Sequence, residues 1–303
     1  MPRSIFNKKT VSLAALAVAG SLSLPALAVP VVIQNGFVQA GVSDYGTLGS
    51  NGNTSPGILY DRTGTANYGV NDFLTPGSPF EGFYVTTATG AGNGSANNQG
   101  PAGFGLTSPT SVSGTSATWS GTNGSFNIFN TYTLTTLGGQ SVIAITSVLT
   151  NISDAALVGV NFLRTLDPDP DVNAFGSYST NNIVLSDNQA CGTGPASGQT
   201  ICIYSFDNTT HKAGVSSGWT TNPANYLVGV NDGPVGDYAI GVGFALGDMA
   251  AGQAYTLSYG YSLGATRDAA SGGGTVPEPA SLALFGIGFA ALALLRRRER
   301  TDV

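Results

Sequence analysis

Three carboxylates near the middle of the chain are the residues best suited to chemistry. They lie in the run Asp167-Pro168-Asp169-Pro170-Asp171, which directly follows a predicted strand. Proline holds φ near −65°, so the run is expected to be extended, with Asp167, Asp169 and Asp171 on one side. Gathered carboxylates repel one another unless a cation neutralises them, and oxygen ligands suit Ca²⁺. The run is a candidate calcium site; the alternative is a solvated acidic turn in which Arg164 pairs with one Asp.

The two cysteines of the chain, Cys191 and Cys202, flank a stretch rich in Gly, Pro and Ser. The ends of the chain indicate export, as described below, and an exported protein with two cysteines is expected to form a disulfide. Two free thiols are the alternative. Two Cys and one His fall short of the four ligands of a structural zinc site.

No set of residues predicts a catalytic site. The run Gly214-Val215-Ser216-Ser217-Gly218 matches the G-x-S-x-G of hydrolases, but His211 precedes the serine and no helical pattern follows it. Glycoside hydrolysis needs two carboxyl groups at a defined separation, and the spacing of the remaining acidic residues selects no pair. We therefore predict a protein that is not an enzyme.

Composition points to strands and turns. Residues 29–274 contain one Lys and one Glu, so good helix formers are scarce, whereas the whole chain contains 43 Gly. The formal net charge is −6. An acidic surface poor in lysine argues against nucleic acid as a partner, because nucleic-acid binding needs a basic footprint.

Hydrophobic alternation predicts a large antiparallel β-sandwich. Phe126, Ile128, Tyr132 and Leu134 share one face at period two, and Gly138-Gly139 mark a hairpin turn. The strands 126–134, 142–149 and 157–166 are expected to form a meander of successive antiparallel strands. Further strands are expected at 36–42, 81–87, 183–185, 201–206, 226–230, 238–246 and 255–263, with a flexible loop at 89–103. The pattern resembles, at fold level, the two-sheet sandwiches of carbohydrate-binding and sugar-modifying proteins.

Both ends of the chain carry targeting signals. Residues 1–28 have a basic start, an apolar run and the A-x-A site Ala26-Leu27-Ala28, which predicts a signal peptide. Near the other end, an uncharged run of 16 residues, 280–295, predicts a helix of about 24 Å, short for the roughly 30 Å hydrocarbon core. Arg296, Arg297 and Arg298 follow it and predict a cytoplasmic orientation for that end.

The tail resembles the PEP-CTERM sorting signal of Gram-negative bacteria. The residues that carry the resemblance are Val276, Pro277, Glu278 and Pro279, the apolar run and the three arginines. The resemblance implies recognition by an exosortase, a membrane protease-transpeptidase that removes the tail near Pro-Glu-Pro. It also implies a setting beside exopolysaccharide production. It covers only the tail, so it leaves the activity of the body open.

The expected organisation is a signal peptide (1–28), a β-sandwich ectodomain (29–270), a Gly-rich linker (271–275) and a sorting signal (276–303). We expect export through the inner membrane, a transient stay there, and a final place in the cell envelope, at the cell surface or outside the cell. Exosortase is the expected partner, with exopolysaccharide or matrix as a second one. The alternative function is a carbohydrate-binding or carbohydrate-active domain.

Overall fold

The computed structural model describes residues 30–52, 54–75 and 80–272. The predicted signal peptide with its Ala26 and Ala28, the Pro277-Glu278-Pro279 motif and the predicted membrane helix lie outside these residues. Among the helices within them, none has the length and apolar character needed to span a membrane.

The described chain forms three sheets and three short helices. The smallest sheet has the order β1 (Val31–Gln34), β2 (Val38–Val42), β3 (Ile58–Tyr60). A five-stranded sheet has the order β14 (His211–Ser216), β16 (Ala239–Met249), β10 (Leu157–Asp167), β4 (Phe80–Thr86), β5 (Gly94–Asn97). A nine-stranded sheet has the order β15 (Val235–Gly236), β11 (Thr180–Ser186), β12 (Gln189–Thr193), β13 (Thr200–Ser205), β17 (Ala254–Gly264), β9 (Gln140–Asn151), β8 (Phe126–Leu137), β7 (Ser116–Thr122), β6 (Thr110–Ser113). The helices are α1 (Val172–Phe175), α2 (Pro223–Leu227) and α3 (Arg267–Ser271).

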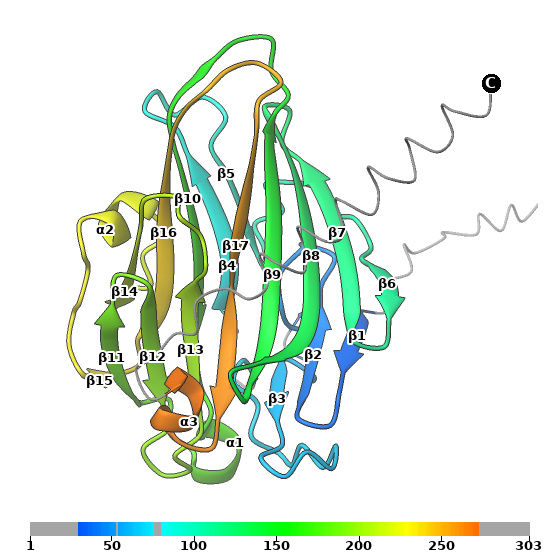
Figure 1. Ribbon diagram of the computed structural model, residues 1–303, viewed down its shortest axis with the longest axis vertical. Coiled ribbons are helices and arrows are strands. Elements are labelled where there is room, and N and C mark those ends of the chain that lie inside the picture. Colours follow the sequence, from blue (N-terminus) through cyan, green and yellow to red (C-terminus); the bar gives the residue numbers. More distant parts are fainter. Residues whose placement is uncertain (1–29, 53, 76–79, 273–303) are drawn as a thin grey trace, which may run out of the picture.

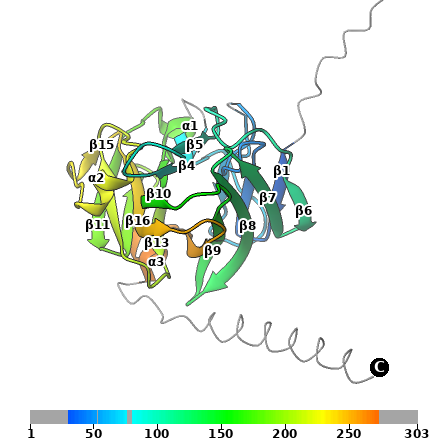
Figure 2. The same ribbon diagram turned by 90° about the horizontal axis from the view of Figure 1, so that it is seen from above.

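The two larger sheets pack face to face (Figures 1 and 2). Phe162 of β10 lies 5.8 Å from Tyr259 of β17 between ring centroids, and Phe83 of β4 lies 5.9 Å from Trp119 of β7. These rings belong to one continuous buried cluster that also includes the small sheet. The pairings of neighbouring strands in all three sheets are antiparallel. The predicted all-β fold is confirmed.

The clearest periodic segment behaves as predicted. Phe126, Ile128, Tyr132 and Leu134 of β8 are buried, as is Asn130 on the same face, while the residues that alternate with them are more exposed. Gly138 and Gly139 have φ of 57° and 85°, and β8 and β9 pair on either side of them. Two left-handed residues match the twist of a tight hairpin, which explains the Gly-Gly centre.

The predicted meander is wrong at its third strand. The edge of β9 that faces away from β8 pairs with β17. Strand β10 lies in the other sheet, between β4 and β16. Asn151 turns the chain across the edge of the sandwich, donating from Nδ2 to the carbonyls of Ala155 and Met249 at 2.8 and 3.0 Å. The order of the strands along the sequence predicted that β10 pairs with β9, but the chain crosses to the other sheet between them.

Two local predictions also fail. Residues 226–230 were expected to be a strand, but Tyr226 lies in α2, which begins with Pro223 after the N-cap Asn222. The side chain of Asn222 accepts from the N–H of Ala224, a start signal that outweighs the β propensity of the segment. The predicted loop 89–103 contains β5, whose small residues pair with β4 at a sheet edge and therefore show no apolar period.

The disulfide between Cys191 and Cys202 is present and joins directly paired residues of β12 and β13. Both half-cystines are buried against Ala270 of α3. Helix α3 includes Ser271 and is capped by Gly272, so these two residues belong to the folded body, and the predicted linker 271–275 begins too early. The cap Thr266, which accepts from the N–H of Ala269, starts the helix that the sequence interpretation missed.

A fully buried ion pair joins two neighbouring strands of the five-stranded sheet. Both side chains of Arg164 on β10 and Glu81 on β4 are 0% exposed, and Nη2 of Arg164 lies 2.8 Å from Oε2 of Glu81. Glu81 also accepts from Arg164 Nε, from the N–H of Leu48 and from the hydroxyl of Tyr261 on β17. Burial lowers the pKa of Arg164. The Glu81 carboxylate, together with nearby tyrosines, raises it by more, so the pKa lies well above its usual value.

We predict that Glu81→Gln destabilises the protein by about 3–5 kcal/mol, because it leaves the Arg164 charge buried without a counter-charge. Asp187→Asn is the matched control. Asp187 pairs with Lys212 at 3.8 Å on the surface and should cost at most about 1 kcal/mol. Urea unfolding of both variants measures the difference, and equal losses would show that the buried pair is not critical.

Candidate functional site

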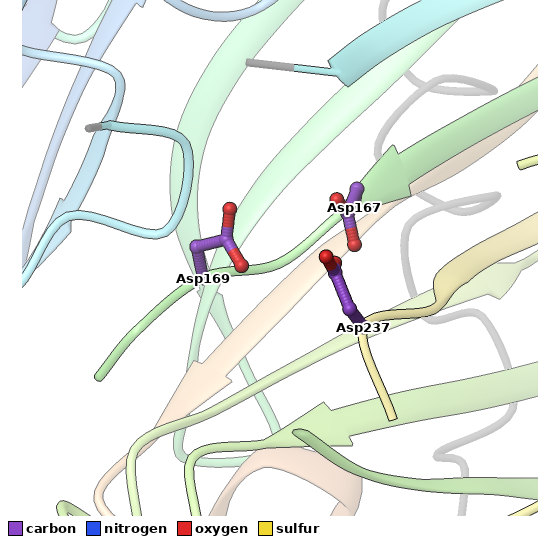
Figure 3. A group of neighbouring side chains, drawn as sticks. All are labelled: Asp167, Asp169 and Asp237. Carbon is purple, nitrogen blue, oxygen red and sulfur yellow. The ribbon is translucent and has the colours of Figure 1, made fainter. Parts of the chain in front are cut away.

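Three aspartates from two separate segments converge at one end of the five-stranded sheet (Figure 3). Asp167 is the last residue of β10, Asp169 lies two residues beyond it, and Asp237 precedes β16. One carboxylate oxygen of each lies within 4.8 Å of the others. Asp167 and Asp169 are 3% and 4% exposed, and Asp237 is partly buried. We call these three residues the carboxylate cluster.

Strand register explains why the cluster forms. Leu166 of β10 pairs with Ile240 of β16 in antiparallel fashion. Residues that follow Leu166 therefore lie beside residues that precede Ile240, which places Asp167 and Asp169 next to Asp237. Asp237 is far away in sequence and has no distinctive neighbours, so only the pairing of β10 with β16 reveals it.

The predicted ligand set is brought together only in part. Asp171 ends the extended run, with φ of −102° and ψ of −3°, because α1 begins at the next residue. Its carboxylate accepts from the N–H groups of Ala196 and Ser197 at 2.7 and 3.1 Å, in the loop between β12 and β13. The alternative, an Asp paired with Arg164, is also wrong, since Arg164 binds Glu81.

Within the described part of the chain, no ion pair balances the negative charge of the carboxylate cluster. The Oδ1 atoms of Asp167, Asp169 and Asp237 are buried and without a hydrogen-bond partner, and neither ion pair found there includes them. Burial, followed by the Asp169 and Asp237 carboxylates, raises the pKa of Asp167 to about 9. Burial and the Asp237 carboxylate raise the pKa of Asp169 to about 8. Without a cation, the folded protein therefore keeps protons on these groups at neutral pH.

This arrangement predicts that the chelator-treated protein loses stability as the pH rises. Both folded-state pKa values lie above the ordinary aspartate value, so the contribution of each group is complete below about pH 4 and lost through pH 8 to 9. Each retained proton contributes a slope of about 1.4 kcal/mol per pH unit. Thermal unfolding in EDTA from pH 5 to 9 measures it. Asp167→Asn should flatten the dependence of Tm on pH, whereas Asp154→Asn, at an exposed position, should leave it unchanged. A Tm of the parent protein that stays level from pH 5 to 9 would contradict the prediction.

An open groove with aromatic walls lies beside the carboxylate cluster. Its volume is about 530 Å³, and its lining includes Phe80, Tyr84, Trp219, Ser95, Asn97 and Gln99. The ring of Phe80 stacks on Trp219 at 6.0 Å and on Tyr84 at 6.4 Å between centroids. Phe80 and Trp219 are partly exposed. We call this feature the aromatic groove.

Two contacts connect the aromatic groove to the carboxylate cluster. Phe80 is the register partner of Asp167, and the indole N–H of Trp219 donates to the backbone carbonyl of Asp237 at 3.2 Å. Trp219 has a φ of 47°, a left-handed value that is uncommon for a residue with a large side chain. Such strain often accompanies a functional position. Trp119, the other tryptophan, is a core residue with 2% exposure.

The hydrolase-like motif has no catalytic geometry. Ser216 is buried, and its hydroxyl accepts from the N–H of Thr220 at 3.1 Å. The imidazole of His211 hydrogen-bonds with the carbonyl of Thr209 and the side chain of Asn188. Because the imidazole of His211 is engaged in these contacts, it does not activate Ser216. The motif lacks the strand–turn–helix context of a hydrolase, and the sequence predicted this result for that reason.

The tail of the chain defines a class of exported protein. Residues 275–298 match the model described as the PEP-CTERM protein-sorting motif. The predicted sorting signal is thereby confirmed, and it implies export and processing by an exosortase. The match begins after the described body ends at Gly272, so it carries no statement about the body.

The body resembles several solved structures distantly. A candidate aldose 1-epimerase of Escherichia coli K12 has a TM-score of 0.41 and 13% identity, covering 78% of this chain and 98% of its own. A galactose mutarotase related enzyme of Lactobacillus acidophilus has a TM-score of 0.36 and 9% identity over 78% and 98%. A polysaccharide lyase has a TM-score of 0.36 and 12% identity over 83% of this chain and 35% of its own. These likenesses are too distant to assign an activity. No curated protein matches the sequence.

Proposed function

We propose that this protein is a non-enzymatic component of the cell envelope or extracellular matrix, delivered by exosortase and associated with exopolysaccharide. The observation that carries the proposal is the sorting motif at residues 275–298. The A-x-A site at Ala26 and Ala28 supports export, and Arg296, Arg297 and Arg298 support a transient stay in the inner membrane with the tail end in the cytoplasm.

The described body supports a role without catalysis. Ser216 and His211 are each engaged in separate local hydrogen bonds, as described above. The Cys191–Cys202 disulfide leaves no free thiol among the described residues. A disulfide-bonded body poor in lysine suits an oxidising compartment outside the cytoplasm.

We predict that replacing Pro277, Glu278 and Pro279 with alanine blocks processing while leaving the apolar run intact. The unprocessed chain should then accumulate in the membrane fraction, because the anchor is retained. Immunoblots of membrane, envelope and medium fractions measure the distribution. Asp302→Asn, outside the matched residues, is the control. Unchanged processing of the triple variant, or unchanged processing in a strain without exosortase, would overturn the proposal.

A second candidate function is carbohydrate binding in the aromatic groove. The observation that favours it is the partly exposed stack of Phe80 and Trp219 beside the side-chain amides of Asn97 and Gln99. Aromatic faces offer an apolar platform for the C–H faces of a sugar ring, and amides and hydroxyls suit sugar hydroxyl groups. An exopolysaccharide chain is the ligand that fits both this groove and the proposed location.

We predict that Trp219→Ala weakens binding of exopolysaccharide by about tenfold or more, the usual effect of truncating a central aromatic contact. Affinity gel electrophoresis with polysaccharide purified from the host measures the change. Tyr178→Ala removes an exposed aromatic ring that is absent from the groove lining, and it should leave binding unchanged. Equal binding by Trp219→Ala and the parent would exclude the groove as the binding site.

A further inference from the structure

The carboxylate cluster has the properties of an incomplete coordination shell. It gathers three acidic side chains, and two of them are more than nine-tenths buried with an unpartnered Oδ1. A buried carboxylate oxygen without a donor is costly, and such groups are normally paired or coordinate a metal. Within the described residues, neither ion pair, Arg164 with Glu81 or Lys212 with Asp187, provides a cationic partner for these three carboxylates. The compensating charge must therefore come from a proton or from an ion.

The spacing of the oxygens is within the reach of one Ca²⁺ ion. Two oxygens on opposite sides of Ca²⁺, each about 2.3–2.6 Å from it, lie about 5 Å apart, whereas Mg²⁺ at about 2.0–2.1 Å allows only about 4.2 Å. The oxygens of the cluster lie within 4.8 Å of one another, inside the span of about 5 Å that Ca²⁺ allows. All three ligands are hard oxygen donors, so a metal that prefers nitrogen or sulfur is disfavoured.

We propose that Asp167, Asp169 and Asp237 form a calcium-binding site. The ion bridges the end of β10 to the segment before β16, two parts of the chain that strand pairing already brings together. Partly exposed Asp237 leaves room for water to complete the six to eight ligands that Ca²⁺ takes. The site goes beyond the proposed sorting and carbohydrate binding and depends on neither.

Calcium in this site has a structural consequence for the aromatic groove. The backbone carbonyl of Asp237 accepts the indole N–H of Trp219, so an ion that holds Asp237 also restrains one wall of the groove. Asp167 acts likewise through its register partner Phe80, whose ring stacks on Trp219. The ion thereby stiffens the groove without lying in it.

The test is thermal unfolding of the full-length protein after chelator treatment, with CaCl₂, MgCl₂ or NaCl at equal ionic strength. We expect Ca²⁺ to raise the Tm, Mg²⁺ to raise it less at the same concentration, and NaCl to leave it unchanged. Asp167→Asn and Asp237→Asn should each abolish the calcium-induced rise. In EDTA at pH 8 both variants should unfold at the same or a higher temperature than the parent, because they relieve repulsion. A misfolded variant would instead unfold at a lower temperature than the parent, so the loss of a calcium ligand can be distinguished from misfolding.

Asp171→Asn distinguishes the structural ligand set from the contiguous run of aspartates. Asp171 accepts from Ala196 and Ser197 instead of joining the cluster, so this variant should have a lower baseline Tm but keep the full calcium-induced rise. Isothermal titration with CaCl₂ should give one site per chain in the parent and in Asp171→Asn. No response in the parent, a response that survives in Asp167→Asn and Asp237→Asn, or equal responses to Ca²⁺ and NaCl would overturn the proposal.

Discussion

The sandwich depends on one charge pair that is closed off from water. Glu81 and Arg164 lie on neighbouring strands of the five-stranded sheet, and Tyr261 reaches Glu81 from the facing sheet. The guanidinium of Arg164 also faces the rings of Phe83 and Tyr132 at 5.6 and 5.8 Å. Ions in such a place are tolerated only where geometry satisfies them closely. The pair therefore fixes the alignment of β10 with β4, and the hydroxyl of Tyr261 connects it to the facing sheet.

That alignment sets the position of the functional candidates. Arg164 and Asp167 lie on the same strand, and Glu81 follows Phe80 on the next one. A slip of β10 against β4 would separate the ion pair, and it would also move Asp167 away from Phe80. The buried charge thus holds the register on which both the carboxylate cluster and the aromatic groove depend.

Local patterns in the sequence predicted local structure well and long-range placement poorly. The alternation of β8 and the Gly138-Gly139 turn are short-range signals, and both are confirmed. The transfer of β10 to the other sheet is not encoded by its own pattern, because an apolar strand can pair in either sheet. Asp237 was missed for the same reason: its role comes from the pairing of β10 with β16. Asp171 was misplaced because helix α1 interrupts the alternation.

The end of the body constrains how an exosortase reaches its substrate. Helix α3 is fastened to β9, since Nε2 of Gln140 donates to the carbonyl of Ala270, and the fold continues to its cap at Gly272. Five residue steps separate Gly272 from Pro277 and span at most about 17 Å. An enzyme that cuts at Pro-Glu-Pro from the membrane must therefore work within that tether length of a rigid, disulfide-bonded surface. The surface around α3 thus becomes part of what the enzyme has to accommodate.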